Sequence, residues 1–180
     1  MDIVDFNQID SKKRYELMAG NIIPRPIAWI MTENRGVLNL APFSYFTGVS
    51  SKPPLLMVSI GRFKKGLNKP KDTFKNIKET KKATICLVEG DMMQIMDKTA
   101  EILDCSEVDK FNIPTYRVLE DFPPIVKGVK RAFFTTLYGT FENEEMATIP
   151  FFLKIEKMYI NGDFEPLARV GKGYAKLKEI

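Results

Sequence analysis

Residues 39–54 read Asn-Leu-Ala-Pro-Phe-Ser-Tyr-Phe-Thr-Gly-Val-Ser-Ser-Lys-Pro-Pro, and this stretch decides the fold that we expect. Aromatic and β-branched residues are typical of strands, whereas Pro42 and the Pro53-Pro54 pair cannot donate to a strand's hydrogen-bond ladder. The stretch therefore predicts short strands separated by kinks. Two interpretations stay open: strands with a turn at each end, or the rim of a ligand site, where freed backbone amides and serine hydroxyls bind a polar group.

Similar segments lie on both sides of this stretch. On its N-terminal side, a turn over 33–36 is predicted to join two apolar runs in a hairpin, because Asn and Gly tolerate positive φ. On its C-terminal side, runs of Val, Ile, Phe and Thr recur along the chain. Strands are predicted over 27–32, 37–40, 43–49, 55–60, 83–88, 131–142, 150–160 and 167–177.

Two other segments have the apolar spacing of amphipathic helices. They are 72–82, where Asp72 or Thr73 would be the N-cap, and 91–103. Antiparallel strands in such numbers need a closed or sandwiched sheet to hide their edges. We therefore expect a mainly β protein with helices, in which an antiparallel β-barrel has two main helices packed on it.

Composition sets the class of protein and excludes several chemistries. The 180 residues are 44% hydrophobic and 28% charged, which suits a single domain over 1–180 with an N-terminal extension over 1–14. The chain has no histidine, so catalysis by Ser-His-Asp or Cys-His is excluded. Cys86 in a predicted strand and Cys105 in a polar stretch lack metal-ligand spacing, so no metal is expected. An enzyme of this composition needs a cofactor for its chemistry.

The location that we expect is the cytoplasm. The start of the sequence, Met1-Asp2-Ile3-Val4-Asp5, is acidic and lacks the basic and apolar regions of a signal peptide. No apolar run approaches the roughly 20 residues that a membrane-spanning helix needs, so no membrane partner is expected.

Positive charge is concentrated in one part of the sequence. The net charge is +4, and the segment 62–82 holds nine Lys or Arg residues against two acids. Such a segment indicates a solvated face, an anion site or a nucleic-acid surface. Within it, Lys71-Asp72-Thr73 precedes or begins the predicted helix, where free N–H groups favour an anion. The Asp72 carboxylate argues against this interpretation, because it can occupy the cap itself.

Several motifs, in this order, resemble the flavin reductase-like family, and its flavoredoxin-type branch most closely. The segment 24–30, Pro-Arg-Pro-Ile-Ala-Trp-Ile, precedes the stretch quoted above. Lys71-Asp72-Thr73, the Val-Asp-Lys-Phe run at 108–111 and a closing Leu-Ala-Arg-Val-Gly run at 167–171 follow it. The resemblance extends over roughly residues 15–178. No G-x-G-x-x-G or P-loop motif competes with it.

The resemblance implies an FMN-binding split barrel that forms a homodimer, with one flavin per subunit near the interface. FAD is the less favoured cofactor, NAD(P)H is the possible electron donor, and a redox partner protein is the possible acceptor. Two alternatives remain, a non-catalytic FMN-binding protein and a barrel that binds single-stranded nucleic acid, although we expect no nucleic-acid partner. The flavin-binding residues implied are Arg25, Pro26, Asn39, Leu40, Ala41, Pro42, Phe43, Ser44, Ser50, Ser51, Lys71, Asp72 and Thr73.

Overall fold

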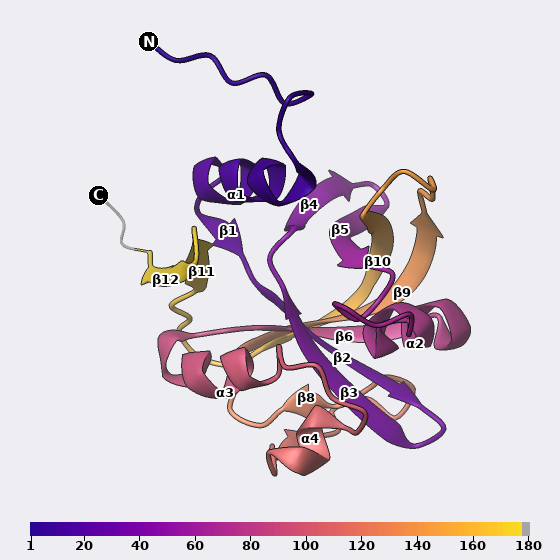
Figure 1. Ribbon diagram of the computed structural model, residues 1–180. Helices are drawn as coiled ribbons and strands as arrows, with labels where there is room; N and C mark the ends of the chain where they lie inside the picture. Colours follow the sequence, from indigo (N-terminus) through magenta and orange to yellow (C-terminus); the bar gives the residue numbers. More distant parts are fainter. Residues whose placement is uncertain (178–180) are drawn as a thin grey trace.

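Seven antiparallel strands form one curved sheet in the computed structural model, which describes residues 1–177 (Figure 1). They are β2 (Ala28–Asn34), β3 (Val37–Phe43), β4 (Phe46–Ser51), β5 (Pro54–Gly61), β6 (Lys82–Leu87), β9 (Arg131–Thr140) and β10 (Thr148–Ile160). Their order in space is β3-β2-β6-β9-β10-β5-β4. β10 pairs with both β5 and β9, and two register shifts along its pairing with β9 add curvature. The expected mainly β fold, an antiparallel barrel with helices packed on it, is confirmed.

The remaining elements pack around this barrel. The short strand β1 lies beside the C-terminal hairpin β11–β12 in a three-stranded sheet, and β7 pairs with β8. Helix α1 lies near β1 and β4, α2 covers the barrel beside β2, and α3 and α4 lie on the β3 side (Figure 1). Their bounds are α1 (Ser11–Asn21), β1 (Arg25–Pro26), α2 (Asp72–Thr80), the 3₁₀ helix η1 (Gly90–Met92), α3 (Met93–Lys98), α4 (Glu107–Lys110), β7 (Thr115–Tyr116), β8 (Ile125–Val126), β11 (Leu167–Val170) and β12 (Gly173–Lys176).

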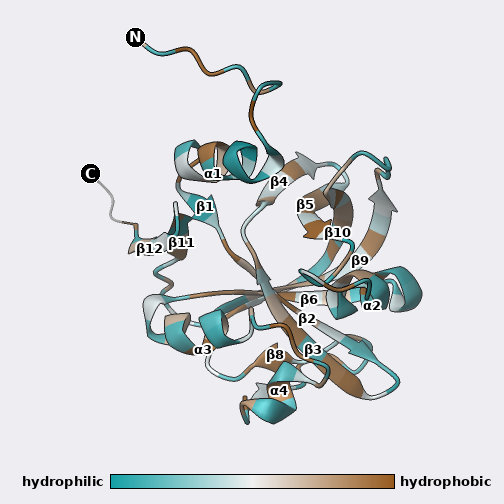
Figure 2. Ribbon diagram, viewed as in Figure 1, coloured by the Kyte–Doolittle hydropathy of each residue, from teal (hydrophilic) through white to brown (hydrophobic). Residues whose placement is uncertain are grey.

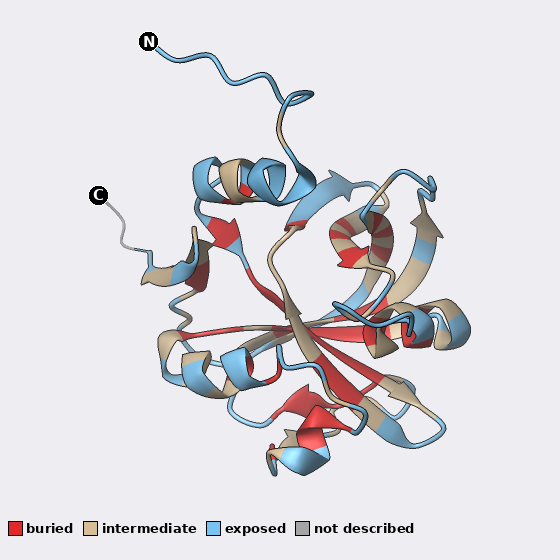
Figure 3. Ribbon diagram, viewed as in Figure 1, coloured by how far each residue is buried: buried red, intermediate tan, exposed pale blue. Residues whose placement is uncertain are grey.

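Two apolar clusters fill the space on the two faces of the sheet. Successive side chains of a strand point to opposite faces, so Trp29 and Met31 lie in one cluster and Ala28 and Ile30 in the other. The middle strands are accordingly brown in the hydropathy view and red in the burial view, whereas the outer faces of the helices are polar and exposed (Figures 2 and 3). Trp29 is completely buried, which decides that it belongs to the core.

Helix α2 begins differently from the prediction. Its N-cap is Lys71, and no side chain accepts a hydrogen bond from the first turn at that position, so the assignment of Asp72 or Thr73 as the cap is wrong. Thr73 lies inside the helix, and its hydroxyl accepts a hydrogen bond from Asn39 instead. The helix ends at Lys81 in the left-handed conformation, with φ 63°. The first-turn N–H groups of α2 are therefore not occupied by a capping side chain.

The second predicted helix, 91–103, is shorter than its apolar spacing suggests. A 3₁₀ turn precedes α3, and α3 ends before Thr99. The Thr99 hydroxyl donates to Met96 O at 2.7 Å and accepts from Trp29 Nε1 at 2.9 Å. This tertiary contact between buried groups holds the end of α3 against β2, and the segment that follows turns away.

Two predicted strands have different bounds in the structure. The strand expected over 43–49 is displaced to β4, because the chain turns at Ser44-Tyr45 where Tyr45 O accepts from Ser59 N. The strand expected over 167–177 is the hairpin β11–β12, in which Gly171 adopts φ 53° at the turn. Residues 1–10 lie outside any helix or strand. The division into one domain with an extension over 1–14 stays a prediction.

Candidate functional site

The edge strand β3 carries most of the predicted site residues. β3 pairs with β2 on one side only, and Pro42 is tolerated there because an edge strand can lack an N–H donor. The Leu40 N–H points away from β2 and donates to Glu107 Oε2 at 3.1 Å. The Leu40 side chain itself is buried in the core. Leu40 therefore supports the site through its backbone.

A buried network of amides and hydroxyls joins β3 to α2. Asn39 Nδ2 donates to Thr73 Oγ1 at 2.9 Å and lies 3.4 Å from Thr32 Oγ1. Asn76 Nδ2 donates to the same Thr32 hydroxyl at 3.0 Å. All four residues are buried, and buried polar groups that bond to one another hold a fixed geometry. The network fixes the first turns of α2 against the floor formed by Asn39.

A cavity of about 280 Å³ opens beside this network, and we call it the lysine cavity. Strand β3 forms its floor, the start of α2 and the preceding loop form one wall, and the segment after α3 forms the other. Seven of the predicted flavin-binding residues line this cavity. Its lining is Asn39, Ala41, Pro42, Phe43, Lys64, Lys65, Lys71, Asp72, Thr73, Thr99, Ala100, Glu101, Ile102, Leu103 and Glu107.

Lys71 is a partly buried cation of this cavity. Its N–H donates to Arg62 O, and its ammonium lies 5.5 Å from the centre of the Phe43 ring. Burial lowers the pKa of the Lys71 ammonium from its ordinary value. A partly buried cation gains from a bound anion, because the anion replaces the solvation that the ammonium has lost. The uncapped start of α2 adds N–H donors at the same place.

Glu107 is a buried carboxyl in the lysine cavity that the sequence analysis did not select. Burial raises its pKa, its hydrogen bonds from backbone N–H groups and the Lys64 charge oppose that rise, and the Asp72 charge adds to it. Glu107 opens α4 after the N-cap Ser106, which accepts from Asp109 N. In the sequence this pattern is the ordinary signature of a helix start, so it gives no sign of a ligand site.

A second cavity, of about 240 Å³, adjoins the first, and we call it the tyrosine cavity. The two cavities share Pro42, Phe43 and Ala100 as lining residues. The walls of the second come from α1, α3 and the hairpin β11–β12, so residues far apart in the chain meet there. Its lining is Tyr15, Ile27, Pro42, Phe43, Ser44, Met96, Asp97, Ala100, Arg169 and Tyr174.

Three side chains at the rim of the tyrosine cavity form one cluster. The Arg169 guanidinium lies 4.4 Å from the centre of the Tyr174 ring and 3.9 Å from Asp97 Oδ1. The Tyr174 hydroxyl donates to the same Asp97 oxygen. Burial and this hydrogen bond raise the pKa of Tyr174 to about 12, so the phenol stays protonated at neutral pH. Asp97 and Tyr174 thus hold the guanidinium at the cavity rim.

Arg25 is buried beneath this region and does not line either cavity. Its guanidinium donates to Ser44 Oγ at 2.8 Å and to Gly171 O at 3.1 Å, and it lies over the Tyr45 ring. Its backbone pairs with Arg169, and Pro26 pairs with Ala168. Arg25 and Pro26 therefore join the C-terminal hairpin to the site. Ser44, which accepts the hydrogen bond from Arg25, lines the tyrosine cavity, whereas Arg25 does not.

Ser50 and Ser51 lie away from the other predicted residues within one chain. Both are exposed on β4, opposite Leu55 and Pro54 at the start of β5. Lys71 lies near the other end of β5, where its N–H bonds to Arg62 O. The length of β5 puts about 20 Å between these ends. Among the described residues, neither serine lines the two cavities, and their role stays a prediction.

The described part of the chain contains no group of three or more His, Cys, Asp or Glu side chains placed to hold a metal ion. No helix within residues 1–177 is long and apolar enough to cross a membrane.

Comparisons with known proteins agree with this architecture. The model of the flavin reductase like domain matches residues 18–178. An uncharacterised Bacillus subtilis protein, YwrF, is 30% identical over 200 residues, which cover 99% of this chain and 96% of the relative. An uncharacterised Aquifex aeolicus protein is 29% identical, covering 93% and 91% of the two chains.

Solved structures show the same fold. Nitrilotriacetate monooxygenase component B from Bacillus cereus superimposes with a TM-score of 0.89 at 26% identity, covering 100% of this chain and 97% of that one. A Shewanella frigidimarina protein described as a putative flavin reductase with a split barrel domain gives 0.84 at 20% identity, covering 100% and 96%. The resemblance noted in the sequence is confirmed: the chain belongs to the flavin reductase-like family, has its split-barrel fold and is a flavin-dependent oxidoreductase.

Proposed function

We propose that the protein binds the FMN moiety of a flavin across the lysine and tyrosine cavities and transfers electrons through it. The observation that carries the proposal is the shared wall of Pro42, Phe43 and Ala100, which makes the two cavities neighbours along β3. The lysine cavity has three lysines with three carboxylates beside them, and the tyrosine cavity has three aromatic rings. This matches the two ends of FMN, a charged phosphate and a planar ring system.

The residues of the lysine cavity fit a phosphate. Lys64, Lys65 and Lys71 supply positive charge, and the uncapped first turn of α2 supplies N–H donors. Asp72 does not cap the helix; its carboxylate pairs with Lys64 at 2.8 Å. In the sequence analysis the Asp72 carboxylate argued against an anion at the start of α2. That argument is weaker in the structure, because the ammonium of Lys64 already pairs with this carboxylate. Asn39 and Glu107 offer polar atoms to a ribityl chain.

The tyrosine cavity suits the ring. Tyr15, Phe43 and Tyr174 give planar apolar surface, and the Arg169 guanidinium supplies a fixed positive charge at the rim. A bound flavin supplies the hydride and electron chemistry that no side chain of this chain provides. The protein's part is to align the ring and to exclude water from one face. A chain without histidine can do this, since alignment needs no side-chain base.

We propose NAD(P)H as the electron donor and a free flavin or a redox partner protein as the acceptor. We further propose a cytoplasmic location. Two unpaired cysteines, Cys86 and Cys105, support it, because reducing compartments keep thiols free.

We propose a homodimer in which the partner copy supplies Ser50 and Ser51. Strand β4 is an edge strand with five exposed residues in succession, which is a surface that natural proteins usually cover. About 20 Å separates these serines from Lys71 within one chain, so only a second copy could bring them to the same flavin. Sedimentation at several concentrations tests this proposal: a monomer at micromolar concentration contradicts it.

The first experiment is a visible absorption spectrum of the purified protein, followed by identification of any flavin released on heating. Yellow protein that releases flavin supports the proposal. Addition of NADH or NADPH without a partner then separates the functions: bleaching indicates a reductase, whereas no bleaching indicates an electron carrier or a non-catalytic flavin-binding protein. Protein that is colourless and takes up neither FMN nor FAD contradicts the proposed function and returns attention to the basic segment 62–82.

A further inference from the structure

Arg25 is a buried cation that lies at the junction of three chain segments around the tyrosine cavity. Only 4% of its surface is exposed. Its guanidinium donates to Ser44 Oγ, between β3 and β4, and to Gly171 O in the turn of the C-terminal hairpin. The same guanidinium lies 5.9 Å from the centre of the Tyr45 ring. One side chain therefore joins parts of the chain that are up to 146 positions apart.

Each of these three contacts leads to a wall of the tyrosine cavity. Ser44 lines the cavity itself. Gly171 lies in the turn of the hairpin β11–β12, which supplies two of the lining side chains. The Tyr45 ring lies 6.1 Å from the ring of Tyr15, which lines the cavity from α1. Arg25 does not line the cavity, so it contacts the neighbourhood of three of its walls from behind.

The C-terminal hairpin is held firmly at its base and by fewer buried contacts near its turn. Leu167 and Ala168, at the base, are buried in the core. Near the turn, the ion pair of Lys172 with α1 uses a lysine side chain that is 91% exposed, and Asp97, which bonds the hairpin to α3, is 60% exposed. Exposed ion pairs contribute little to stability. The bond from Arg25 supplies a buried attachment at this end of the hairpin.

The bond from Arg25 also decides what the Ser44 hydroxyl offers to a ligand. A serine hydroxyl has one proton to donate and lone pairs that accept. Because Ser44 Oγ accepts from the Arg25 guanidinium at 2.8 Å, its own proton is left to donate on the cavity side. A hydroxyl that is bonded to a cation is polarised and binds an acceptor more strongly. The polar edge of a planar ring offers such acceptors.

The hydrogen bonds of Arg25 are incomplete. Its Nε is buried without a hydrogen-bond partner among residues 1–177. A buried donor that lacks an acceptor lowers stability, so the fold alone does not explain an arginine here. We propose that Arg25 is a positioning residue, which holds Ser44 and the C-terminal hairpin where they contact a flavin ring and does not touch the ring itself. The inference rests on the proposed function, and it differs from the direct contact that the family resemblance implies.

Arg25→Lys tests the proposal because it keeps the positive charge. One ammonium cannot replace the planar fork that reaches Ser44 and Gly171 together. In fluorescence titrations, riboflavin and FMN should each bind at least about tenfold more weakly and by the same factor, because the loss of a charge-assisted bond disturbs only the ring end. Unchanged riboflavin affinity, or a larger loss for FMN than for riboflavin, would overturn the proposal.

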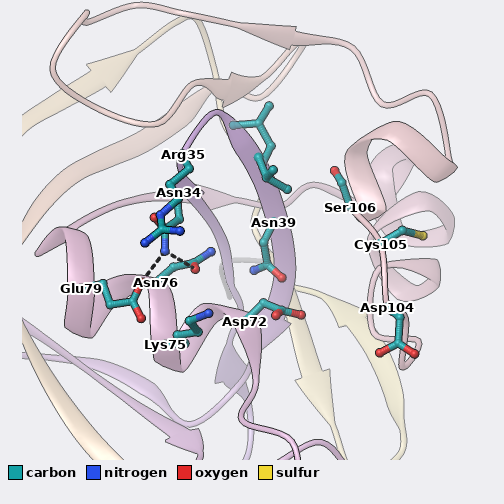
Figure 4. A pocket seen from close by; sticks show the side chains of 12 residues that line it. Asn34, Arg35, Asn39, Asp72, Lys75, Asn76, Glu79, Asp104, Cys105 and Ser106 are labelled. Atoms are coloured by element: carbon teal, nitrogen blue, oxygen red, sulfur yellow. Dashed lines mark hydrogen bonds between the residues drawn. The ribbon is translucent and has the colours of Figure 1, made fainter.

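Two matched controls replace arginines that lie elsewhere. Arg131 also bonds a backbone carbonyl, that of Gly162, and lies over an aromatic ring, but it is not among the described residues that line either cavity. Arg35 lines a different cavity, of about 320 Å³, between α2 and the segment 104–106 (Figure 4). Arg131→Lys and Arg35→Lys should leave both affinities unchanged. A loss in either control as large as that in Arg25→Lys would contradict a role specific to the tyrosine cavity.

The Tyr174 phenol gives a second readout, which needs no flavin. Burial and the bond to Asp97 raise its pKa to about 12 from the ordinary 10.0. If Arg25→Lys releases the hairpin, this phenol should ionise nearer its ordinary pKa and add one tyrosinate to the ultraviolet difference spectrum. Tyr174→Phe, made in both backgrounds, assigns the signal.

The two readouts separate the failure of this inference from the failure of the proposed function. If Tyr174 ionises at the same pH with and without Arg25→Lys, Arg25 does not position the hairpin, and the inference is overturned even when flavin binds. If neither riboflavin nor FMN binds the unmodified protein, the proposed function fails and the assignment to a flavin ring fails with it. The Tyr174 titration then still decides whether Arg25 holds the hairpin.

Discussion

Replacing Thr99 by valine should destabilise the fold and show that the end of α3 is held by the core tryptophan. The Thr99 hydroxyl accepts from Trp29 Nε1 at 2.9 Å and donates to Met96 O at 2.7 Å. Both Thr99 and Trp29 are buried, at 1% and 0% exposure. Valine has nearly the same shape, so the substitution removes the two hydrogen bonds without opening a large cavity.

The magnitude follows from the groups left behind. A buried indole N–H without an acceptor costs about 1–3 kcal/mol, and the lost bond to Met96 O adds about 1 kcal/mol. We expect Thr99→Val to lower the free energy of unfolding by about 3 kcal/mol, which is about 6–12 °C in Tm for a chain of this size. Thr135 is the matched control, because its buried hydroxyl only donates to Ala83 O, at 2.9 Å. Thr135→Val should cost about 1 kcal/mol.

Urea unfolding followed by circular dichroism measures both variants, with the denaturant slope required to stay unchanged. Trp29 is the single tryptophan, so its fluorescence reports the same contact directly. Thr99→Ser, which keeps the hydroxyl, should recover most of the stability. If Thr99→Val is no less stable than Thr135→Val, the hydroxyl does not hold Trp29, and the account of why α3 ends here is wrong.

Two further predictions concern the site, and a third concerns a cysteine of the core. Lys71→Met should weaken FMN binding at least about tenfold and leave riboflavin binding unchanged in fluorescence titrations, because only FMN carries the phosphate; equal losses for both ligands would contradict a phosphate site. The affinity for the flavin phosphate should fall as the pH rises above 4.5, the ordinary pKa of a Glu carboxyl. Burial raises the pKa of Glu107, and once ionised its carboxylate repels the phosphate. Glu107→Gln should flatten that part of the curve of affinity against pH, and an unchanged slope would count against the role of Glu107. A thiol reagent should titrate one cysteine in the native protein and two in urea, because burial raises the pKa of Cys86 to about 12 and hides its thiol; two reactive thiols in the native state would refute its burial.

Most of the fold could be predicted from the sequence, because its strand and turn signals agree with the tertiary structure. The apolar run of β2 and the turn at Arg35-Gly36 together predict a hairpin, and the structure contains it. The errors occur where tertiary contacts override local preference. The apolar spacing of 91–103 continues past the end of α3, but the bond between Thr99 and Trp29 depends on a residue 70 positions away.

The site was predicted where its residues are contiguous in the chain. The 39–44 stretch and Lys71-Asp72-Thr73 were chosen, and most of their members line the two cavities. Arg169 lies in the 167–171 run that carried the family resemblance and Tyr174 lies three residues beyond it, yet only folding places them beside Pro42. Their selection required knowing that β11 pairs with β1, a contact between the two ends of the chain that no local pattern encodes.

The order of strands in the barrel has a consequence for how the protein is made. While the ribosome is still translating the region before Arg131, the emerged chain can form only two separate pieces, β3-β2-β6 and β5-β4. The edges of β6 and β5 that will later pair with β9 and β10 then have no partner, and both strands are rich in buried apolar residues. Translation proceeds at roughly 5–20 residues per second, so several seconds pass between the synthesis of β6 and the synthesis of β9 and β10. Nascent chains whose translation stalls during this time expose two unpaired strand edges that can pair with other chains. They are therefore the form of this protein that chaperones need to shield.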